Sequence, residues 1–136
     1  MKVFIFYGLL AWGYKASAGQ ATIAVASNFI KPMTALVKEF EAWSPHKLTV
    51  VYGSSGRLFA QISNGAPFDV FLSADSLKPT RLIEDGYGVA GSQMTYAVGR
   101  LALWSNKAGV VVNNEDVLSN GTFSAIAIAN PRLAPY

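Results

Sequence analysis

Two kinds of apolar pattern alternate along the chain. Short apolar runs with β-branched residues and a polar end, typical of buried strands, occupy residues 21–27, 48–52 and 68–73. Apolar residues three and four positions apart, which mark one face of a helix, follow the first run at Met33, Leu36, Val37 and Phe40. Strands that alternate with helices predict βαβ units, and therefore an α/β fold with a parallel sheet.

Turn-forming residues set the expected ends of the helices. Asn28 is a good helix cap, and a Ser-Pro-His break at residues 44–46 is expected to end the first helix. Residues 58–62 predict a short second helix. Residues 77–85 predict a third, which Gly86 stops.

The C-terminal part of the chain is less regular. Residues 96–104 and 123–129 are strand candidates, and residues 115–118 predict one helical turn within a polar loop. An Asn-Pro pair ends the last strand candidate, and no covering helix follows it before Tyr136. A parallel α/β fold is not expected to end in this way.

The N-terminus has the pattern of a secretory signal peptide. Lys2 supplies a positive start, residues 3–14 form an apolar run, and residues 16–18 read Ala-Ser-Ala, a typical cleavage site. The run is shorter than the roughly 20 residues that a membrane-spanning helix needs. We therefore expect residues 1–18 to be removed and the mature chain to begin at Gly19; a buried N-terminal element is the alternative.

Composition agrees with an exported, folded protein. The 136 residues are 51% hydrophobic and 14% charged, which favours one globular domain over disorder. Removal of Lys2 and Lys15 with the signal lowers the net charge from +3 to +1, so the charge does not indicate nucleic-acid binding. The chain contains no cysteine, which excludes disulfides and thiolate metal sites.

Polar turns follow the first two predicted strands. Ser27 and Asn28 follow the first, and the second leads into the turn Gly53-Ser54-Ser55-Gly56. Phosphate-binding loops of nucleotide enzymes end in Gly-Lys-Ser/Thr, whereas Arg57 follows Gly56 here. Carboxyl ends of parallel strands meet at one edge of a sheet, so both turns are expected to face one crevice.

Hydroxyl groups and free backbone N–H groups are hydrogen-bond donors suited to a small oxyanion. Each helix N-terminus adds about 0.3–1 kcal/mol for an anion, and each hydrogen bond to a charged partner roughly 1.5–3 kcal/mol. The two turns therefore favour binding of a small oxyanion over a nucleotide. Ordinary helix capping by serine and asparagine remains the alternative.

Catalytic alternatives have less support. Ser55 is a candidate nucleophile for an α/β hydrolase, but such a serine needs a base, and the only histidine, His46, lies in a predicted loop. No G-x-S-x-G motif is present. Asp69 is expected to begin a strand and Asp75 to cap a helix, so neither predicts a carboxylate pair or a cation site.

Four motifs together resemble the periplasmic molybdate-binding proteins of ABC transporters. They read Ala-Ser-Asn-Phe at 26–29, Gly-Ser-Ser-Gly at 53–56, Asn-Gly-Ala-Pro-Phe-Asp-Val-Phe-Leu-Ser-Ala-Asp at 64–75 and Asn-Pro-Arg-Leu-Ala-Pro-Tyr at 130–136. The resemblance covers essentially all of the expected mature chain. It implies a two-lobed periplasmic binding protein fold of type II, with residues 19–98 in the first lobe and residues 99–136 beginning a second lobe that is incomplete.

The resemblance also implies how the anion is held. It implies oxyanion ligands at Ser27, Asn28, Ser55 and Tyr136. It implies turn-shaping roles for Gly53, Ser54 and Gly56, and leaves the roles of Arg57 and Arg132 open. The ligand would be molybdate or tungstate, bound as an oxyanion without a metal cation or a cofactor, and a sulfate-binding homologue is the close alternative.

The implied biology is transport rather than catalysis. Such a protein is not an enzyme; it passes its ligand in the periplasm to a membrane permease driven by a cytoplasmic ATPase, and is a monomer when full length. Cytoplasmic regulators with a similar effector fold are disfavoured by the signal-like N-terminus. Because the second lobe is incomplete, we expect this chain to be an N-terminal fragment that binds more weakly than a chain of family length.

Overall fold

The computed structural model describes residues 18–111, 116–119 and 123–131. Three parallel strands form one sheet in the order β2-β1-β3. The strands are β1 (Gln20–Ala26), β2 (Lys47–Gly53) and β3 (Val70–Leu72). The helices are η1 (Ser27–Phe29), α1 (Ile30–Trp43), α2 (Ser55–Ser63), α3 (Leu77–Glu84) and α4 (Asp116–Ser119), of which η1 is a single 3₁₀ turn.

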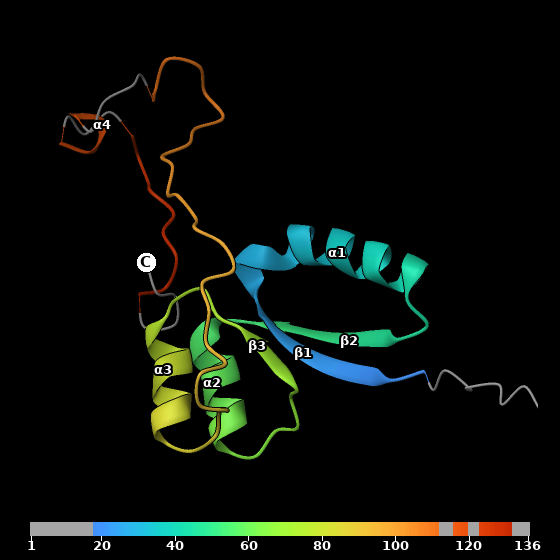
Figure 1. Ribbon diagram of the computed structural model, residues 1–136. Coiled ribbons are helices and arrows are strands. Elements are labelled where there is room, and N and C mark those ends of the chain that lie inside the picture. Colours follow the sequence, from blue (N-terminus) through green and yellow to red (C-terminus); the bar gives the residue numbers. More distant parts are fainter. Residues whose placement is uncertain (1–17, 112–115, 120–122, 132–136) are drawn as a thin grey trace, which may run out of the picture.

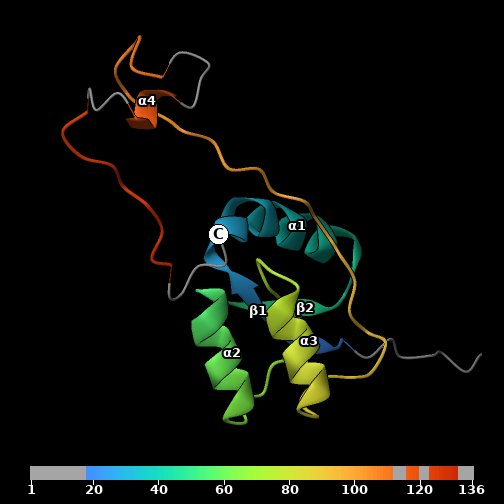
Figure 2. The same ribbon diagram turned by 90° about the vertical axis from the view of Figure 1, so that its left-hand side faces the viewer.

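Helices cover both faces of the sheet. Figures 1 and 2 show α1 on one face, and α2 and α3 side by side on the other. Helix α1 connects β1 to β2, and α2 connects β2 to β3. Parallel strands need such crossovers, because the chain must return from the carboxyl edge of the sheet to its amino edge. The predicted α/β class with a parallel sheet is therefore confirmed.

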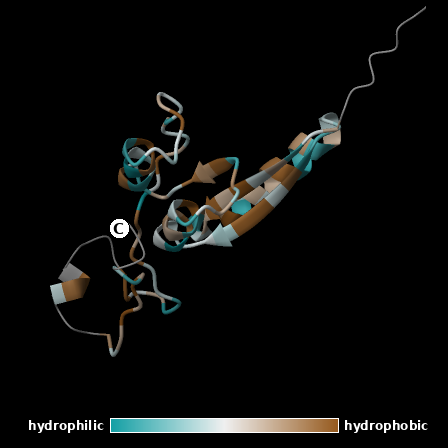
Figure 3. Cartoon of the chain, turned by 90° about the horizontal axis from the view of Figure 1, so that it is seen from below, coloured by the Kyte–Doolittle hydropathy of each residue, from teal (hydrophilic) through white to brown (hydrophobic). Residues whose placement is uncertain are grey.

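The central strand β1 contributes to the core on both faces. Ile23 and Val25 are buried with Met33 of α1. Since successive strand residues point to opposite faces, Ala24 and Ala26 lie toward α2 and α3, and both are almost completely buried. Figure 3 shows apolar residues along the strands of the sheet.

The second face of the sheet has its own buried leucines. Leu58 of α2 and Leu82 of α3 are 1% and 5% exposed. The alanines of β1 are small, which leaves room for both helices to lie against the strand.

Predicted and observed elements agree closely up to Glu84. The strand predictions over 21–27, 48–52 and 68–73 correspond to β1, β2 and a shorter β3. Gly86 has a φ of 81°, a left-handed conformation that suits glycine and ends α3 as expected. The helical turn predicted at 115–118 corresponds to α4.

One cap prediction is wrong. Asn28 does not cap α1: it lies inside η1, and the residue at the N-cap position, Phe29, makes no side-chain capping bond. The chain instead passes from β1 through the 3₁₀ turn directly into α1. The backbone of the turn takes the place of a side-chain cap.

Both C-terminal strand predictions are also wrong. Residues 96–104 and 123–129 contain no strand, and most of their large apolar side chains are exposed. A strand is stable only when a neighbour pairs with it, and these segments have no strand partner in the described part of the chain. Figures 1 and 2 show residues 97–111 leaving the sheet beyond α1 and leading toward α4.

Several predictions fall on residues outside the described ranges. Residues 1–17 of the signal peptide, Arg132 and Tyr136 are among them. Within the described ranges, no helix combines the length and the apolar character that a bilayer crossing needs.

Candidate functional site

Three polar turns meet at the carboxyl edge of the sheet. In the parallel register, Ala26 of β1 pairs with Gly53 of β2, and Val25 pairs with Leu72 of β3. The residues that follow these pairs are therefore neighbours in space. The expectation that the Ser27 and Ser55 turns share one edge is confirmed, and the structure adds a third turn after β3.

The turn after β1 is open to solvent. Ser27 and Asn28 are both exposed, and the 3₁₀ turn that contains them is continuous with the fourteen residues of α1. The first backbone N–H groups of this helical segment lack intrahelical partners, so they are available to an anion.

The turn after β2 uses its two serines differently. Ser54 caps α2: its Oγ accepts a hydrogen bond from the Arg57 backbone N–H at 3.3 Å. Ser55 is only 2% exposed, and its Oγ accepts a hydrogen bond from the Ala74 backbone N–H at 3.0 Å. The Ser55 hydroxyl therefore fastens the turn after β2 to the turn after β3.

This bond also restricts what the Ser55 hydroxyl can do. A serine hydroxyl has one hydrogen to donate and lone pairs that accept. The Ala74 N–H occupies an acceptor position, and among the described residues no acceptor takes the hydroxyl hydrogen. The hydrogen is thus free to be donated to an anion.

The turn after β3 carries an internally paired carboxylate. Asp75 accepts hydrogen bonds from the Lys78 backbone N–H at 2.9 Å and from the Lys78 ammonium at 2.6 Å. Burial opposes ionisation of Asp75, but the hydrogen bonds from Lys78 outweigh it and hold the pKa of Asp75 below its ordinary value. The prediction that Asp75 serves the start of the following helix is confirmed, and its charge is balanced locally.

Tyr96 connects the third turn to the first. Its hydroxyl donates to the backbone carbonyl of Ser73 at 2.8 Å. Its ring meets the ring of Phe29 edge-on, with centroids 5.1 Å apart. Burial raises the pKa of the Tyr96 phenol, which keeps the hydroxyl protonated as a donor.

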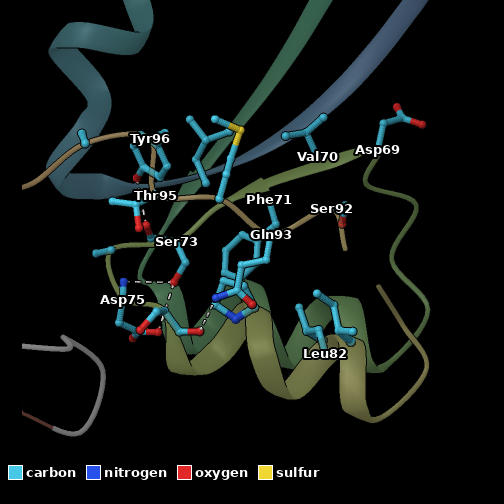
Figure 4. Close-up of a pocket in the computed structure, with 17 residues that line it drawn as sticks. Asp69, Val70, Phe71, Ser73, Asp75, Leu82, Ser92, Gln93, Thr95 and Tyr96 are labelled. Carbon is cyan, nitrogen blue, oxygen red and sulfur yellow. Dashed lines mark hydrogen bonds between the residues drawn. The ribbon is translucent and has the colours of Figure 1, made fainter. Parts of the chain in front are cut away.

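A hollow of about 660 Å³ lies beside this third turn. Figure 4 shows its lining, which comes from β3, from the turn that follows β3, from α3 and from residues 92–97. Its polar groups include Ser73, Asp75 and Gln93, whereas Ser27, Asn28 and Ser55 do not line it. The hollow and the Ser27–Ser55 edge are therefore separate features.

The structure argues against a serine hydrolase. His46 lies at the amino end of β2, where its Nδ1 accepts a hydrogen bond from the Gly19 backbone N–H at 2.8 Å. Ser55 lies beyond the carboxyl end of the same strand, about 20 Å away at the usual rise per residue. The hydroxyl of Ser55 contacts an N–H donor rather than a base.

Sequence reasoning missed three groups of this edge. It did not single out Ser73 or the Ala74 N–H, and it placed Tyr96 only at the start of a strand candidate. Ser73 had a usable signal, since it ends a predicted strand as Ser27 does. Among the described residues no cluster of histidine and carboxylate side chains is suited to a metal cation.

The arrangement of strands and turns matches a known class of proteins. The model of the family described as bacterial extracellular solute-binding protein matches residues 21–136. The chain belongs to this family.

Individual relatives share the same fold. Molybdate-binding protein ModA of Azotobacter vinelandii is 46% identical over 129 residues, covering 95% of this chain and 50% of the relative. ModA of Rhodobacter capsulatus is 44% identical over 121 residues, covering 89% of this chain and 48% of the relative. The solved structure of the Azotobacter vinelandii periplasmic molybdate-binding protein matches with a TM-score of 0.80 and 42% identity, covering 85% of this chain and 50% of that one. The chain spans about half the length of these relatives.

Proposed function

We propose that this chain belongs to the molybdate-binding component of an ABC importer, with the anion held at the carboxyl edge of the sheet. The relatives named as molybdate-binding proteins support the ligand. The single observation on this chain that carries the proposal is the hydrogen bonding of Ser55. Its buried Oγ accepts a hydrogen bond from the Ala74 N–H, and among the described residues no acceptor takes its hydroxyl hydrogen.

The proposed ligands are Ser27, Asn28 and Ser55. The first two lie on an exposed helical start, and the third lies on the neighbouring turn. Each offers a hydroxyl, an amide or a backbone N–H group as donor, and no lysine or arginine is needed. Tyr136 is proposed as a further ligand on the strength of the sequence resemblance alone.

The donor character of the site suits one class of anion. Molybdate, tungstate and sulfate are fully deprotonated at neutral pH and only accept hydrogen bonds. Phosphate largely keeps a proton, and that proton needs an acceptor, whereas the hydroxyl and backbone N–H groups proposed for this site serve as donors. We expect molybdate and tungstate to bind and phosphate to bind poorly.

Calorimetric titration of the chain with molybdate, tungstate, sulfate and phosphate tests this proposal. Ser55→Ala should weaken molybdate binding by roughly tenfold or more, since a hydrogen bond to a charged partner is lost. Ser63→Ala is the matched control, because it makes the same change at the opposite end of α2. Equal affinity for phosphate and molybdate would show that the donor-only site is wrong.

A purely structural role for Ser55 gives a different result. If its hydroxyl only fastens the two turns, Ser55→Ala lowers the midpoint of thermal unfolding without changing the affinity of the folded protein. Measuring both quantities on the same variant therefore separates ligand binding from loop attachment.

We further propose export to the periplasm with cleavage between Ala18 and Gly19. The charged start, the apolar run and the Ala-Ser-Ala site support it, and the solved relative is named as periplasmic. Mass spectrometry of exported protein should find Gly19 at the N-terminus. Mature protein that retains residues 3–14 would contradict the signal peptide.

The proposed partner is the membrane permease of the importer. The division into a first lobe over 19–98 and the beginning of a second lobe over 99–136 is also part of the proposal. It is supported by the fold of residues 18–97 and by the point at which the chain leaves the sheet.

A further inference from the structure

Tyr96 connects the turn after β1 with the turn after β3. Its hydroxyl bonds the carbonyl of Ser73, and its ring contacts Phe29. Phe29 is the residue after Asn28, and Ser73 is the residue before Ala74, whose N–H group binds Ser55. Tyr96 therefore contacts both the residue after Asn28 and the residue before Ala74, whose N–H group binds the Ser55 hydroxyl.

The backbone that carries Tyr96 is itself held. Gln93, three residues earlier, donates to the Ser76 carbonyl at 3.2 Å and accepts from the Thr80 hydroxyl at 3.0 Å. Figure 4 shows Gln93, Thr95 and Tyr96 along the wall of the hollow, next to Ser73 and Asp75. Past Ala97 the chain leaves the sheet. Tyr96 therefore makes its contacts with Ser73 and Phe29 just before this departure.

We propose that Tyr96 is a positioning residue for the oxyanion site. It sets the Asn28 turn through Phe29 and the Ser55 hydroxyl through the backbone at Ser73 and Ala74, without touching the anion. This inference rests on the proposed function. The inference adds that the Tyr96 side chain couples the segment that leaves the sheet to the geometry of the anion site.

The two contacts of Tyr96 can be removed separately. Tyr96→Phe keeps the ring against Phe29 and loses the bond to Ser73, whereas Tyr96→Leu loses both. A hydrogen bond of this kind contributes enough for about a three- to tenfold change in affinity. We expect molybdate affinity to fall by that factor in Tyr96→Phe and further in Tyr96→Leu.

Tyr87→Phe is the matched control. Tyr87 is an exposed tyrosine shortly after the end of α3, and its side chain makes no hydrogen bond or ring contact within the described part of the chain. The same chemical change there should leave affinity unchanged. An equal loss of affinity in Tyr87→Phe and Tyr96→Phe would overturn the positioning role.

Two further measurements distinguish positioning from general destabilisation. In a double-mutant cycle, the effect of Tyr96→Leu on affinity should shrink in an Asn28→Ala background, because both act on the same turn. Amide hydrogen exchange should speed up at Ala74 in both Tyr96 variants, and at Ile30, whose N–H donates to the Ser27 carbonyl, only in Tyr96→Leu. A merely structural role predicts additive losses and a uniform rise in exchange.

The outcomes separate this inference from the proposed function. If the wild-type chain binds no molybdate in titration, the proposed function fails, while the exchange pattern at Ala74 and Ile30 still decides whether Tyr96 positions the turns. If the wild-type chain binds and both Tyr96 variants match its affinity and exchange, the positioning role is overturned.

Discussion

At the scale of single residues, adjacent serines perform different tasks. Ser54 stabilises the start of α2 with its own side chain, while Ser55 reaches across to the loop after β3. Identical side chains one position apart can therefore be tested for stability and for binding separately.

We predict that Ser54→Ala destabilises the protein by about 1 kcal/mol, the usual cost of losing a helix cap. Chemical denaturation gives this free energy of unfolding directly. Ser63→Ala serves as the control, because the Ser63 Oγ is buried without a hydrogen-bond partner in the described structure. Its removal should be neutral or stabilising; a larger loss at Ser63 than at Ser54 would contradict the prediction.

Asp75 makes stability depend on pH. Its folded-state pKa is below the ordinary value of 3.8, so its contribution is present above that value and is lost as the pH falls through the folded-state pKa. We predict that Asp75→Asn lowers stability by about 1 kcal/mol at pH 7, and that the difference disappears in strong acid. Thermal unfolding across this range measures it.

Asp85→Asn is the control for that experiment. Asp85 pairs with Arg81 at 3.6 Å on an exposed helix surface, where ion pairs contribute little. A pH dependence as large at Asp85 as at Asp75 would show that local pairing with Lys78 is not the cause.

At the scale of elements, the end of β2 and the helix α2 fit closely. A side-chain carbon placed on Gly53 would lie 3.2 Å from Cγ of Leu58, which is almost completely buried. The glycine therefore lets α2 lie against the strand that precedes it. The lack of space for a side chain beside Leu58 is a physical reason for a glycine at position 53.

We predict that Gly53→Ala destabilises the protein by roughly 1–3 kcal/mol through overpacking against Leu58. Gly99→Ala is the matched control, because nothing lies within 4 Å of a side-chain carbon there. Denaturant unfolding of both variants decides the matter. Equal stability of the two variants would mean that Leu58 moves aside at no cost.

The elements that the sequence predicted correctly share a physical property. In β1 to β3 and in α1 to α3, the spacing of the apolar residues places them on the face that packs against the rest of the fold. Local pattern and packing therefore agree. Residues 96–104 and 123–129 have strand-like composition, but a strand also needs a partner. Pattern alone does not supply one, and this is why both strand predictions failed.

The candidate site was predictable only in part. The strand-end positions of Ser27, Asn28 and Ser55 follow from the parallel sheet, and the structure brings their turns to one edge. The Ala74 N–H contact depends on the approach of a separate loop, and no local pattern encodes it. The same holds for the contacts of Tyr96, which the sequence placed only at the start of a strand candidate.

At the scale of the whole molecule, the segment that leaves the sheet exposes large apolar side chains. Val98, Leu101 and Trp104 are each at least three-quarters exposed. Single exposed apolar residues are ordinary, but several close together along one segment make an apolar patch that water solvates poorly.

We predict that this patch binds a hydrophobic dye whose fluorescence rises in apolar surroundings. Trp104→Ser should lower the dye signal by about half if the patch is the main dye site, because the largest exposed ring is lost. Val89→Ser is the control, since Val89 is equally exposed but lies outside the segment. A signal that both substitutions lower equally would contradict a concentrated patch.

The hydrogen bonds of Gly19 have a consequence for the order of events during export. Its N–H group binds His46 and its carbonyl accepts from the Lys47 backbone N–H, so the residue is already part of the sheet edge at the start of β1. A peptidase needs several extended residues on both sides of the bond that it cuts. Cleavage before Gly19 must therefore precede completion of the sheet. A chain whose sheet forms first would therefore hold the proposed cleavage site within the folded structure and slow the removal of the signal.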